Sequence, residues 1–214
     1  MKKNPLLIFD LDGTLSDPTV GIWRSINYAL AAFDYPAVNE QTISQYIGPP
    51  LDVAFRRIAP EASEATILGM VAAYREQYGE VGFAENVVYA GIPDALESLA
   101  SQGVPMGVCT SKRVDFAERI LVLFHLRRYF DFVNGGDVGV GKDHQLRMLR
   151  EQGTADQGSV MIGDRAVDVI AARAAGLRSV GVLWGHGSLQ ELRAVAPDRL
   201  LDAPDELKQL VDAV

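Results

Sequence analysis

Two aspartates near the start of the chain, Asp10 and Asp12, directly follow the short apolar run 6–9. A continuous apolar run of this length is typical of a strand buried on both faces, and residues two apart on a strand lie on the same side. Two carboxylates that converge in this way repel each other unless a cation or a shared proton holds them. A hard cation with oxygen ligands, such as Mg²⁺, would resolve the repulsion. The pair is therefore a candidate catalytic and metal-binding site.

Hydroxyl side chains follow a second apolar run. Thr110 and Ser111 come after the run 105–109, and groups of this kind at a strand end that opens a helix can hold phosphate oxygens. Further along the chain, Lys142 follows a glycine-rich turn and could supply a positive charge to an anionic substrate.

Two more aspartates follow a third apolar run. Asp164 comes after the run 159–162 and Gly163, and it opens the helix predicted for 165–175. Asp168 lies four residues further along that helix and can face the same site, because residues four apart are neighbours on a helix surface.

Each of these features alone also has an ordinary structural interpretation. Asp-Gly is a hairpin-turn signal, Thr-Ser is a common helix cap, and a lone lysine or a helical aspartate usually faces solvent. What favours a functional site is the complete set, in which the candidate groups follow predicted strands in order. In open parallel sheets, ligands bind beyond the carboxyl ends of the strands.

The elements that must position this set are short buried strands separated by helices. Apolar runs predict strands at 6–9, 105–109, 130–133, 159–162 and 179–183. Between them lie helical patterns, of which one begins at Pro93 and ends before Gly103. Strand–helix alternation of this kind predicts an α/β fold with a mainly parallel sheet.

A second helical pattern lies between the last two runs. Val167, Ile170, Ala171 and Ala174 are spaced to share one face of the helix 165–175, and Gly176 ends it.

One stretch, 19–85, shows no convincing strand. Ile22, Ile26, Ala29 and Leu30 fit one helix, and the turn Gly48-Pro49-Pro50 interrupts the region. A second helix is predicted from the spacing of Leu68, Val71, Ala72, Arg75 and Tyr78. We therefore expect a helical cap domain at 17–86, inserted into an α/β core formed by 1–16 and 87–214.

The composition of the chain argues against several classes of function. The net charge of −8 argues against non-specific nucleic-acid binding, which needs a basic surface. No apolar run approaches the roughly 20 residues that span a bilayer, and the one near the N-terminus is too short for a secretory signal. The single cysteine, Cys109, cannot form an intrachain disulfide and is expected to be a buried small side chain. We expect a cytoplasmic protein without nucleic-acid or membrane partners, and the sequence favours no particular oligomeric state.

The whole set resembles the haloacid dehalogenase superfamily, and within it the phosphatases that carry a helical cap after the first strand. Four family motifs are matched in order by Asp10-x-Asp12-Gly13-Thr14, Thr110, Lys142 and Gly163-Asp164-x-x-x-Asp168. The resemblance covers nearly the whole chain and implies a Rossmann-like parallel sheet core with an inserted α-helical cap. The third motif usually reads Lys-Pro, whereas Asp143 follows the lysine here.

The resemblance implies a Mg²⁺-dependent phosphohydrolase that forms an aspartyl-phosphate intermediate. Asp10 would be the nucleophile that attacks phosphorus. Asp12 would protonate the leaving oxygen and then act as the base for water. Asp10, the backbone carbonyl of Asp12, and Asp164 would hold Mg²⁺.

The remaining motif residues would bind the phosphoryl group, whose charge is spread over three oxygens. Thr110 and Lys142, with Ser111 beside them, would contact these oxygens. Asp168 would orient Lys142 or a metal-bound water.

Several substrates and activities stay open. The segments 47–51 and 181–187 are similar to those of phosphoglycolate phosphatases and of a nucleotidase-like group, with phosphoglycolate preferred as the small phosphomonoester. A 5'-nucleotidase-like phosphatase and a β-phosphoglucomutase-like phosphotransferase are the alternatives. Gly48, Pro49 and Arg56 are the candidate specificity residues of the cap.

Other branches of the superfamily fit less well. Dehalogenases of similar build lack the acid that Asp12 supplies, and related phosphonate hydrolases use a cap lysine, whereas no lysine occurs between Asp17 and Glu85. A binding protein with a degenerate site would lack Asp10 or Asp164, and both are present.

Overall fold

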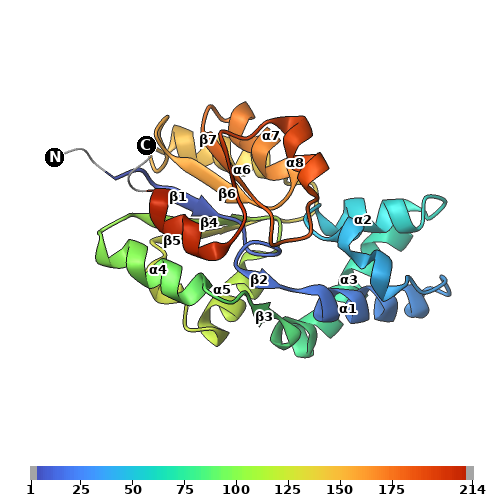
Figure 1. The fold of residues 1–214 in the computed structure, drawn as a ribbon. Coiled ribbons are helices and arrows are strands. Elements are labelled where there is room, and N and C mark those ends of the chain that lie inside the picture. Colours follow the sequence, from blue (N-terminus) through green and yellow to red (C-terminus); the bar gives the residue numbers. More distant parts are fainter. Residues whose placement is uncertain (1–3, 211–214) are drawn as a thin grey trace.

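A computed structural model of the protein describes residues 4–210. Its centre is a six-stranded sheet in the order β5-β4-β1-β6-β7-β8, with all neighbouring strands parallel (Figure 1). The strands are β1 (Leu7–Phe9), β4 (Met106–Thr110), β5 (Phe132–Gly135), β6 (Val160–Gly163), β7 (Arg178–Val182) and β8 (Arg199–Leu201). The five predicted strands and the α/β class are confirmed. The edge strand β8 was not predicted, because it is short and begins with a charged residue.

The sheet separates two apolar cores. Since successive side chains of a strand point to opposite faces, Leu7 and Phe9 join one core while Ile8 joins the other. The first core includes side chains of α4 (Ile92–Ser101) and α5 (Val114–Leu123). The second includes side chains of α6 (Lys142–Glu151) and α7 (Ala166–Ala174). Helices therefore cover both faces of the sheet (Figure 1), which explains why its strands read as continuous apolar runs.

Three shorter elements complete this part of the chain. They are the 3₁₀ helix η3 (Arg127–Tyr129), the helix α8 (Leu189–Val195) and the 3₁₀ helix η4 (Pro204–Leu210).

The helix predicted at 165–175 is confirmed as α7, but its predicted face is buried only in part, at Ala171. Ile170 is 52% exposed, whereas Val169 and Ala172 are buried. The cause is Asp168, which is 1% exposed and accepts hydrogen bonds from the Lys142 ammonium and the Arg165 amide. Because a helix turns by about 100° per residue, an inward Asp168 places Ile170 on the solvent side.

The helical insertion is confirmed between two short antiparallel strands, β2 (Ser16–Asp17) and β3 (Val87–Val88). Residues 18–86 are all described and contain no strand. Their elements are α1 (Thr19–Ala32), η1 (Glu40–Tyr46), α2 (Leu51–Ile58), α3 (Glu64–Glu80) and η2 (Gly82–Glu85). In Figure 1 they lie to one side of the sheet as a separate helical layer. We call this layer the cap.

The face that α3 buries differs in part from the predicted one. Val71 and Tyr78 are buried as expected, but Leu68 is 46% exposed and Tyr74 is buried in its place. The helix is apolar on more than one side, so periodicity alone left its rotation open. Its orientation places Tyr74 and Tyr78 in a stack, with ring centroids 5.3 Å apart, and Tyr78 edge-on to Phe116 of α5.

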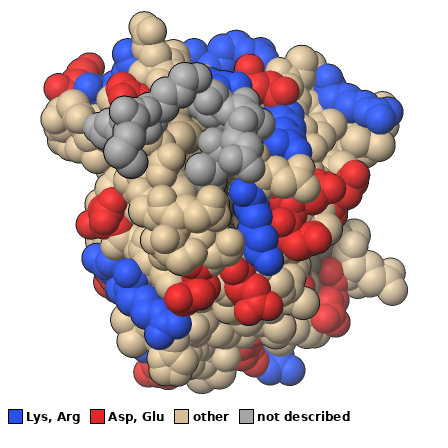
Figure 2. Space-filling model, turned by 60° about the vertical axis from the view of Figure 1, so that its left-hand side comes forward, with Lys and Arg blue, Asp and Glu red and all other residues tan. Residues whose placement is uncertain are grey.

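The surface carries charges of both signs. On the face shown in Figure 2, basic and acidic side chains are interspersed. No helix among residues 4–210 combines the length and the apolar character that crossing a membrane requires.

Candidate active site

Asp10 stands at the carboxyl end of the central strand. Its amide donates a 2.8 Å hydrogen bond to the Ile162 carbonyl of β6, so the backbone still follows the sheet at this point. Because β1 lies between β4 and β6, Thr110 at the end of β4 and Asp164 directly after β6 are brought to the same edge. The structure thus gathers the groups that the sequence predicted beyond the strand ends.

Lys142 is the centre of the site's charge arrangement. Its side chain is fully buried, lies 2.9 Å from Asp10 Oδ2 and also pairs with Asp168. Burial opposes the ammonium charge, but the two carboxylates outweigh burial and raise the pKa of Lys142 above its ordinary value. The unusual Asp143 does not disturb this arrangement, because it pairs with Arg147 at the surface.

Three carboxylates converge beside this lysine. One oxygen each of Asp10, Asp164 and Asp168 lies within 4.8 Å of the others. Burial, helped by Asp168 and Asp10, raises the pKa of Asp164 to about 8. Asp10 Oδ1 is buried and finds no hydrogen-bond partner among the described residues. An all-oxygen donor set with an unpartnered carboxylate oxygen fits a hard divalent cation such as Mg²⁺.

The three carboxylates are not equivalent as ligands. Both oxygens of Asp168 are engaged, one by Lys142 and the other by the Arg165 amide. Among residues 4–210, Asp164 has only neutral donors, the Thr14 hydroxyl at 3.4 Å and the His186 amide at 2.7 Å, so its charge has no direct counter-ion there. Asp10 and Asp164 are therefore better suited to hold a cation than Asp168.

Gly13 permits the close approach of the two acidic segments. It has a φ of +82°, and an added Cβ atom would lie 2.3 Å from an Asp164 carboxylate oxygen. Only glycine fits, because a side chain would meet the carboxylate and would also disfavour this left-handed backbone. The Gly of the first motif thus has a packing reason as well as a turn reason.

Asp12 lies beside Lys112, which also contacts Tyr78 of the cap. It is 8% exposed, and burial raises the pKa of its carboxyl group, with Lys112 partly offsetting the effect. Lys112 Nζ lies 2.9 Å from Asp12 Oδ2, while Asp12 Oδ1 has no partner within residues 4–210. Lys112 was not predicted as a site residue; its only signal was its place two residues after Thr110.

Thr110 and Ser111 line the space between these groups. Thr110 ends β4 and is buried, and its hydroxyl accepts a 3.3 Å hydrogen bond from the Lys112 amide. The Ser111 hydroxyl is buried without a partner in the described part of the chain. Both residues face a cavity that also reaches Asp10, so their hydroxyls are available to a bound anion.

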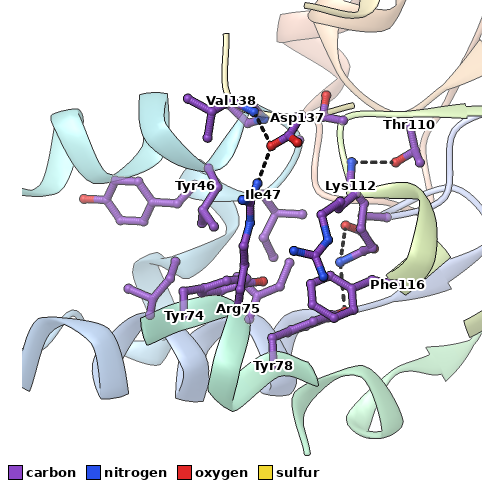
Figure 3. A pocket seen from close by; sticks show the side chains of 18 of the residues that line it. Tyr46, Ile47, Tyr74, Arg75, Tyr78, Thr110, Lys112, Phe116, Asp137 and Val138 are labelled. Atoms are coloured by element: carbon purple, nitrogen blue, oxygen red, sulfur yellow. Dashed lines mark hydrogen bonds and ion pairs between the residues drawn. The ribbon is translucent and has the colours of Figure 1, made fainter. Parts of the chain in front are cut away.

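A cavity that is partly open to solvent lies between the acidic groups and the cap. The cap contributes mainly apolar side chains to its wall, among them Ile22, Ile26, Ile47, Leu51 and Tyr74. Figure 3 shows Ile47 and Tyr74 of the cap on the side of the cavity opposite Thr110 and Lys112 of the core. The cap therefore offers a largely apolar surface to whatever group is attached to a bound phosphate.

Of the candidate specificity residues, Gly48 and Pro49 line the cavity and Arg56 does not. Arg56 lies at an exposed surface, where it forms a 2.6 Å ion pair with Glu64. Of the residues of α2, Leu51 lines the cavity, so the structure gives the prediction for Arg56 no support. The cap arginine in the cavity wall is Arg75, which pairs with Asp137 of the core (Figure 3).

A second residue that the sequence did not indicate joins the core to the cap. The Arg165 guanidinium donates hydrogen bonds to the carbonyls of Ser44, at 3.1 Å, and Ile47, at 2.6 Å. Its Nε donates to Glu191 at 2.8 Å. Arg165 directly follows Asp164, so one short segment both presents a candidate ligand and holds the cap loop.

Comparison with known proteins identifies the chain's relatives. The family model described as haloacid dehalogenase-like hydrolase matches residues 7–182. A 5'-nucleotidase of Pseudomonas aeruginosa is 35% identical, with 99% of this chain and 97% of that protein covered. A phosphoglycolate phosphatase of Pectobacterium atrosepticum is 32% identical, covering 96% and 91%. The crystal structure of a predicted phosphatase from Clostridium acetobutylicum matches with a TM-score of 0.92 at 33% identity, over 100% of both chains.

Proposed function

Because the chain belongs to the haloacid dehalogenase-like hydrolase family and its relatives mark it as a phosphatase, we propose that it hydrolyses a small phosphomonoester through an aspartyl phosphate formed on Asp10. One observation carries this proposal. The buried Asp10 carboxylate has one oxygen paired with Lys142 and the other without a partner among residues 4–210. That second oxygen is available to attack phosphorus or to ligate a cation.

Each step of the proposed reaction is assigned to side chains at this edge of the sheet. A carboxylate oxygen of Asp10 attacks phosphorus, and Asp12 gives its proton to the departing oxygen. Asp12 then takes a proton from the water that cleaves the acyl phosphate. Thr110, Ser111 and Lys142 hold the phosphoryl oxygens during both transfers.

The cofactor we propose is Mg²⁺, held by Asp10, Asp164 and the backbone carbonyl of Asp12. When bound, it would neutralise negative charge on the carboxylates and on the transferring phosphoryl group. Asp168 is assigned to keep Lys142 in place, since both of its oxygens are engaged by Lys142 and the Arg165 amide.

The charged side chains in the cavity wall favour one class of substrate over another. Each cation in its wall is already paired with a carboxylate: Lys112 with Asp12, Arg75 with Asp137 and Arg113 with Asp115. A second anionic group, such as the carboxylate of phosphoglycolate, would have to compete with these pairs. An uncharged, partly apolar leaving group would instead contact the apolar wall.

We therefore favour the 5'-nucleotidase-like alternative, with nucleoside monophosphates as the class of substrate, over the phosphoglycolate that the sequence favoured. The similarity to a 5'-nucleotidase along nearly the whole chain supports this choice. A phosphotransferase would need the cavity to admit a second phosphorylated sugar, and the paired cations disfavour that substrate in the same way.

The division into domains is part of the proposal. We assign 17–86 to a cap that closes over the cavity and 1–16 with 87–214 to the catalytic core, because the β2–β3 ribbon is where the chain passes between them. The cytoplasmic location stays a prediction from the sequence.

The test is phosphate release from a panel of esters, with and without Mg²⁺, in the absence of any sugar acceptor. The panel comprises nucleoside monophosphates, phosphoglycolate and a hexose phosphate. We expect Mg²⁺-dependent release with the highest kcat/KM for a nucleoside monophosphate. Release that needs a sugar acceptor would support the phosphotransferase instead, and release that is equally fast in EDTA would exclude the metal assignment.

A further inference from the structure

Lys112 occupies a position between Asp12 and the cap that the proposed reaction does not yet use. Its Nζ lies 2.9 Å from Asp12 Oδ2 and donates a 2.8 Å hydrogen bond to the Tyr78 hydroxyl of α3. It also lies 4.2 Å from the centre of the Tyr78 ring (Figure 3). The Lys112 side chain is only 6% exposed. One buried ammonium group therefore contacts the core acid and the cap at the same time.

Tyr78 is itself firmly placed. Its hydroxyl accepts a 2.9 Å hydrogen bond from the Asn86 side chain, whose Oδ1 accepts a 3.3 Å hydrogen bond from the Ser16 hydroxyl. Ser16 belongs to β2 and Asn86 directly precedes β3, so Tyr78 is tied to the ribbon where the cap joins the core. The chain of contacts from Asp12 through Lys112 and Tyr78 to Asn86 consists of buried side chains.

The two carboxylate oxygens of Asp12 have different surroundings. Lys112 engages Oδ2, whereas Oδ1 is buried with no hydrogen-bond partner within residues 4–210. A carboxylate that is held by one oxygen presents the other in a fixed direction. The cavity between core and cap is lined by both Asp12 and Lys112, so the Asp12 carboxyl group lies beside the space that a substrate would enter.

We propose that Lys112 is a positioning residue that holds Asp12 Oδ2 so that Oδ1 transfers the proton, and that Tyr78 makes this arrangement depend on the docked cap. The proposal rests on the proposed phosphomonoesterase function. In the first step the proton passes from Asp12 Oδ1 to the leaving oxygen as the P–O bond breaks, which leaves an Asp12 carboxylate paired with the Lys112 ammonium. In the second step a water molecule attacks phosphorus and gives a proton to Oδ1. The bond between phosphorus and the Asp10 oxygen breaks, which releases phosphate.

The test compares two leaving groups, because only one of them needs the proton. An alkoxide leaving group, as in AMP, departs poorly without protonation, whereas p-nitrophenolate departs as a stable anion. We would measure kcat/KM for AMP and p-nitrophenyl phosphate with the wild-type protein, Lys112→Met, Lys112→Arg and Tyr78→Phe. Lys208→Met, at an exposed residue far along the sequence in η4, is the matched control.

We expect Lys112→Met to lower kcat/KM for AMP by about 10²-fold, the lower range for a general acid, and that for p-nitrophenyl phosphate only a few-fold. Lys112→Arg should recover part of the loss, and Tyr78→Phe should show a smaller loss with the same preference for AMP. In an Asp12→Asn background, Lys112→Met should have little further effect, because residues that act through one another are not additive.

Equal losses for the two esters in Lys112→Met, with Tyr78→Phe unaffected, would overturn the proposal and assign Lys112 to substrate binding or to packing. An undiminished effect of Lys112→Met in the Asp12→Asn background would also overturn it. A wild-type protein that hydrolyses neither ester would instead reject the proposed function on which the inference rests. Thermal unfolding of each variant identifies losses that come from misfolding.

Discussion

Lys142 Nζ lies 2.9 Å from Asp10 Oδ2, and the two side chains are 0% and 3% exposed. A buried ammonium group is stable only with counter-charges in contact, and Asp10 and Asp168 supply them. The same contact leaves Asp10 with one oxygen directed away from the lysine. The pair therefore serves both the folding of this edge of the sheet and the reaction proposed there.

Replacing this lysine should affect stability and activity together. Lys142→Met leaves the carboxylates of Asp10 and Asp168 buried without their cation, and breaking a buried pair in this way costs about 3–5 kcal/mol. Urea denaturation should show that loss in the free energy of unfolding, and phosphate release should fall below detection. The control Lys208→Met, at an exposed residue, should change neither. An unchanged unfolding free energy for Lys142→Met would contradict the pairing.

Gly13→Ala should inactivate the protein because of the space that Asp164 occupies. The new Cβ atom would lie 2.3 Å from a carboxylate oxygen, in addition to the cost of a side chain at positive φ. Gly103→Ala is the matched control, since Gly103 has a φ of +68° but nothing within 4 Å of an added Cβ. We expect Gly103→Ala to cost about 1 kcal/mol and to keep full activity. Equal activity in the two variants would show that the contact with Asp164 is unimportant.

Cys109 should be unreactive in the folded protein. It is fully buried in β4, and burial raises the pKa of its thiol to about 12. The reactive thiolate is therefore scarce below that pH. Labelling with Ellman's reagent at pH 8 should proceed only as fast as the protein unfolds, and it should become immediate in guanidinium chloride. Rapid labelling of folded protein would contradict the burial of this strand.

The same shift has a consequence for stability. The pKa of the Cys109 thiol in the folded state lies above the ordinary value of 9.0. The contribution of this thiol to the free energy of unfolding is therefore fully present below pH 9.0. It is lost as pH rises toward 12. Cys109→Ala should therefore weaken the decline of stability in this alkaline range, as followed by thermal unfolding.

Arg165→Gln should loosen the cap loop without removing a group that touches the reacting atoms. The guanidinium bonds to the Ser44 and Ile47 carbonyls are lost, and the cavity wall next to Gly48 loses its support. We expect KM to rise by about tenfold, since two hydrogen bonds from a charged donor are removed, with a smaller change in kcat. Arg150→Gln is the control, because Arg150 donates to one carbonyl at an exposed site. An unchanged KM in Arg165→Gln would exclude a role for Arg165 in holding the cap loop.

The sequence predicted the parallel sheet and the candidate site well, because both depend on local signals. Buried strands such as β1 and β6 read as apolar runs, and the parallel arrangement brings Asp10 and Asp164 to one edge. The helical insertion was visible from the same kind of pattern, since 18–86 contains no strand.

What the sequence could not predict depends on contacts between distant segments. Arg56 and Arg75 are both helical arginines of the cap, and only the packing of α3 against the core places Arg75 in the cavity wall. Lys112 and Arg165 contact the cap through partners 34 and 118 positions away, Tyr78 and Ile47. Ile170 was assigned to a buried face because periodicity takes no account of the inward Asp168.

The central claim is that Asp10 carries the phosphoryl group. The most direct test is to mix the Asp12→Asn variant, in which water attack is slowed, with p-nitrophenyl phosphate and Mg²⁺, and then to quench with borohydride. This ester is used because its leaving group departs without a proton from Asp12. Borohydride reduces an acyl phosphate to an alcohol, so peptide mass spectrometry should find homoserine in place of Asp10, and only when the ester is present. Release of phosphate from this ester by the wild-type protein, with Asp10 unmodified in every quenched sample, would contradict the account.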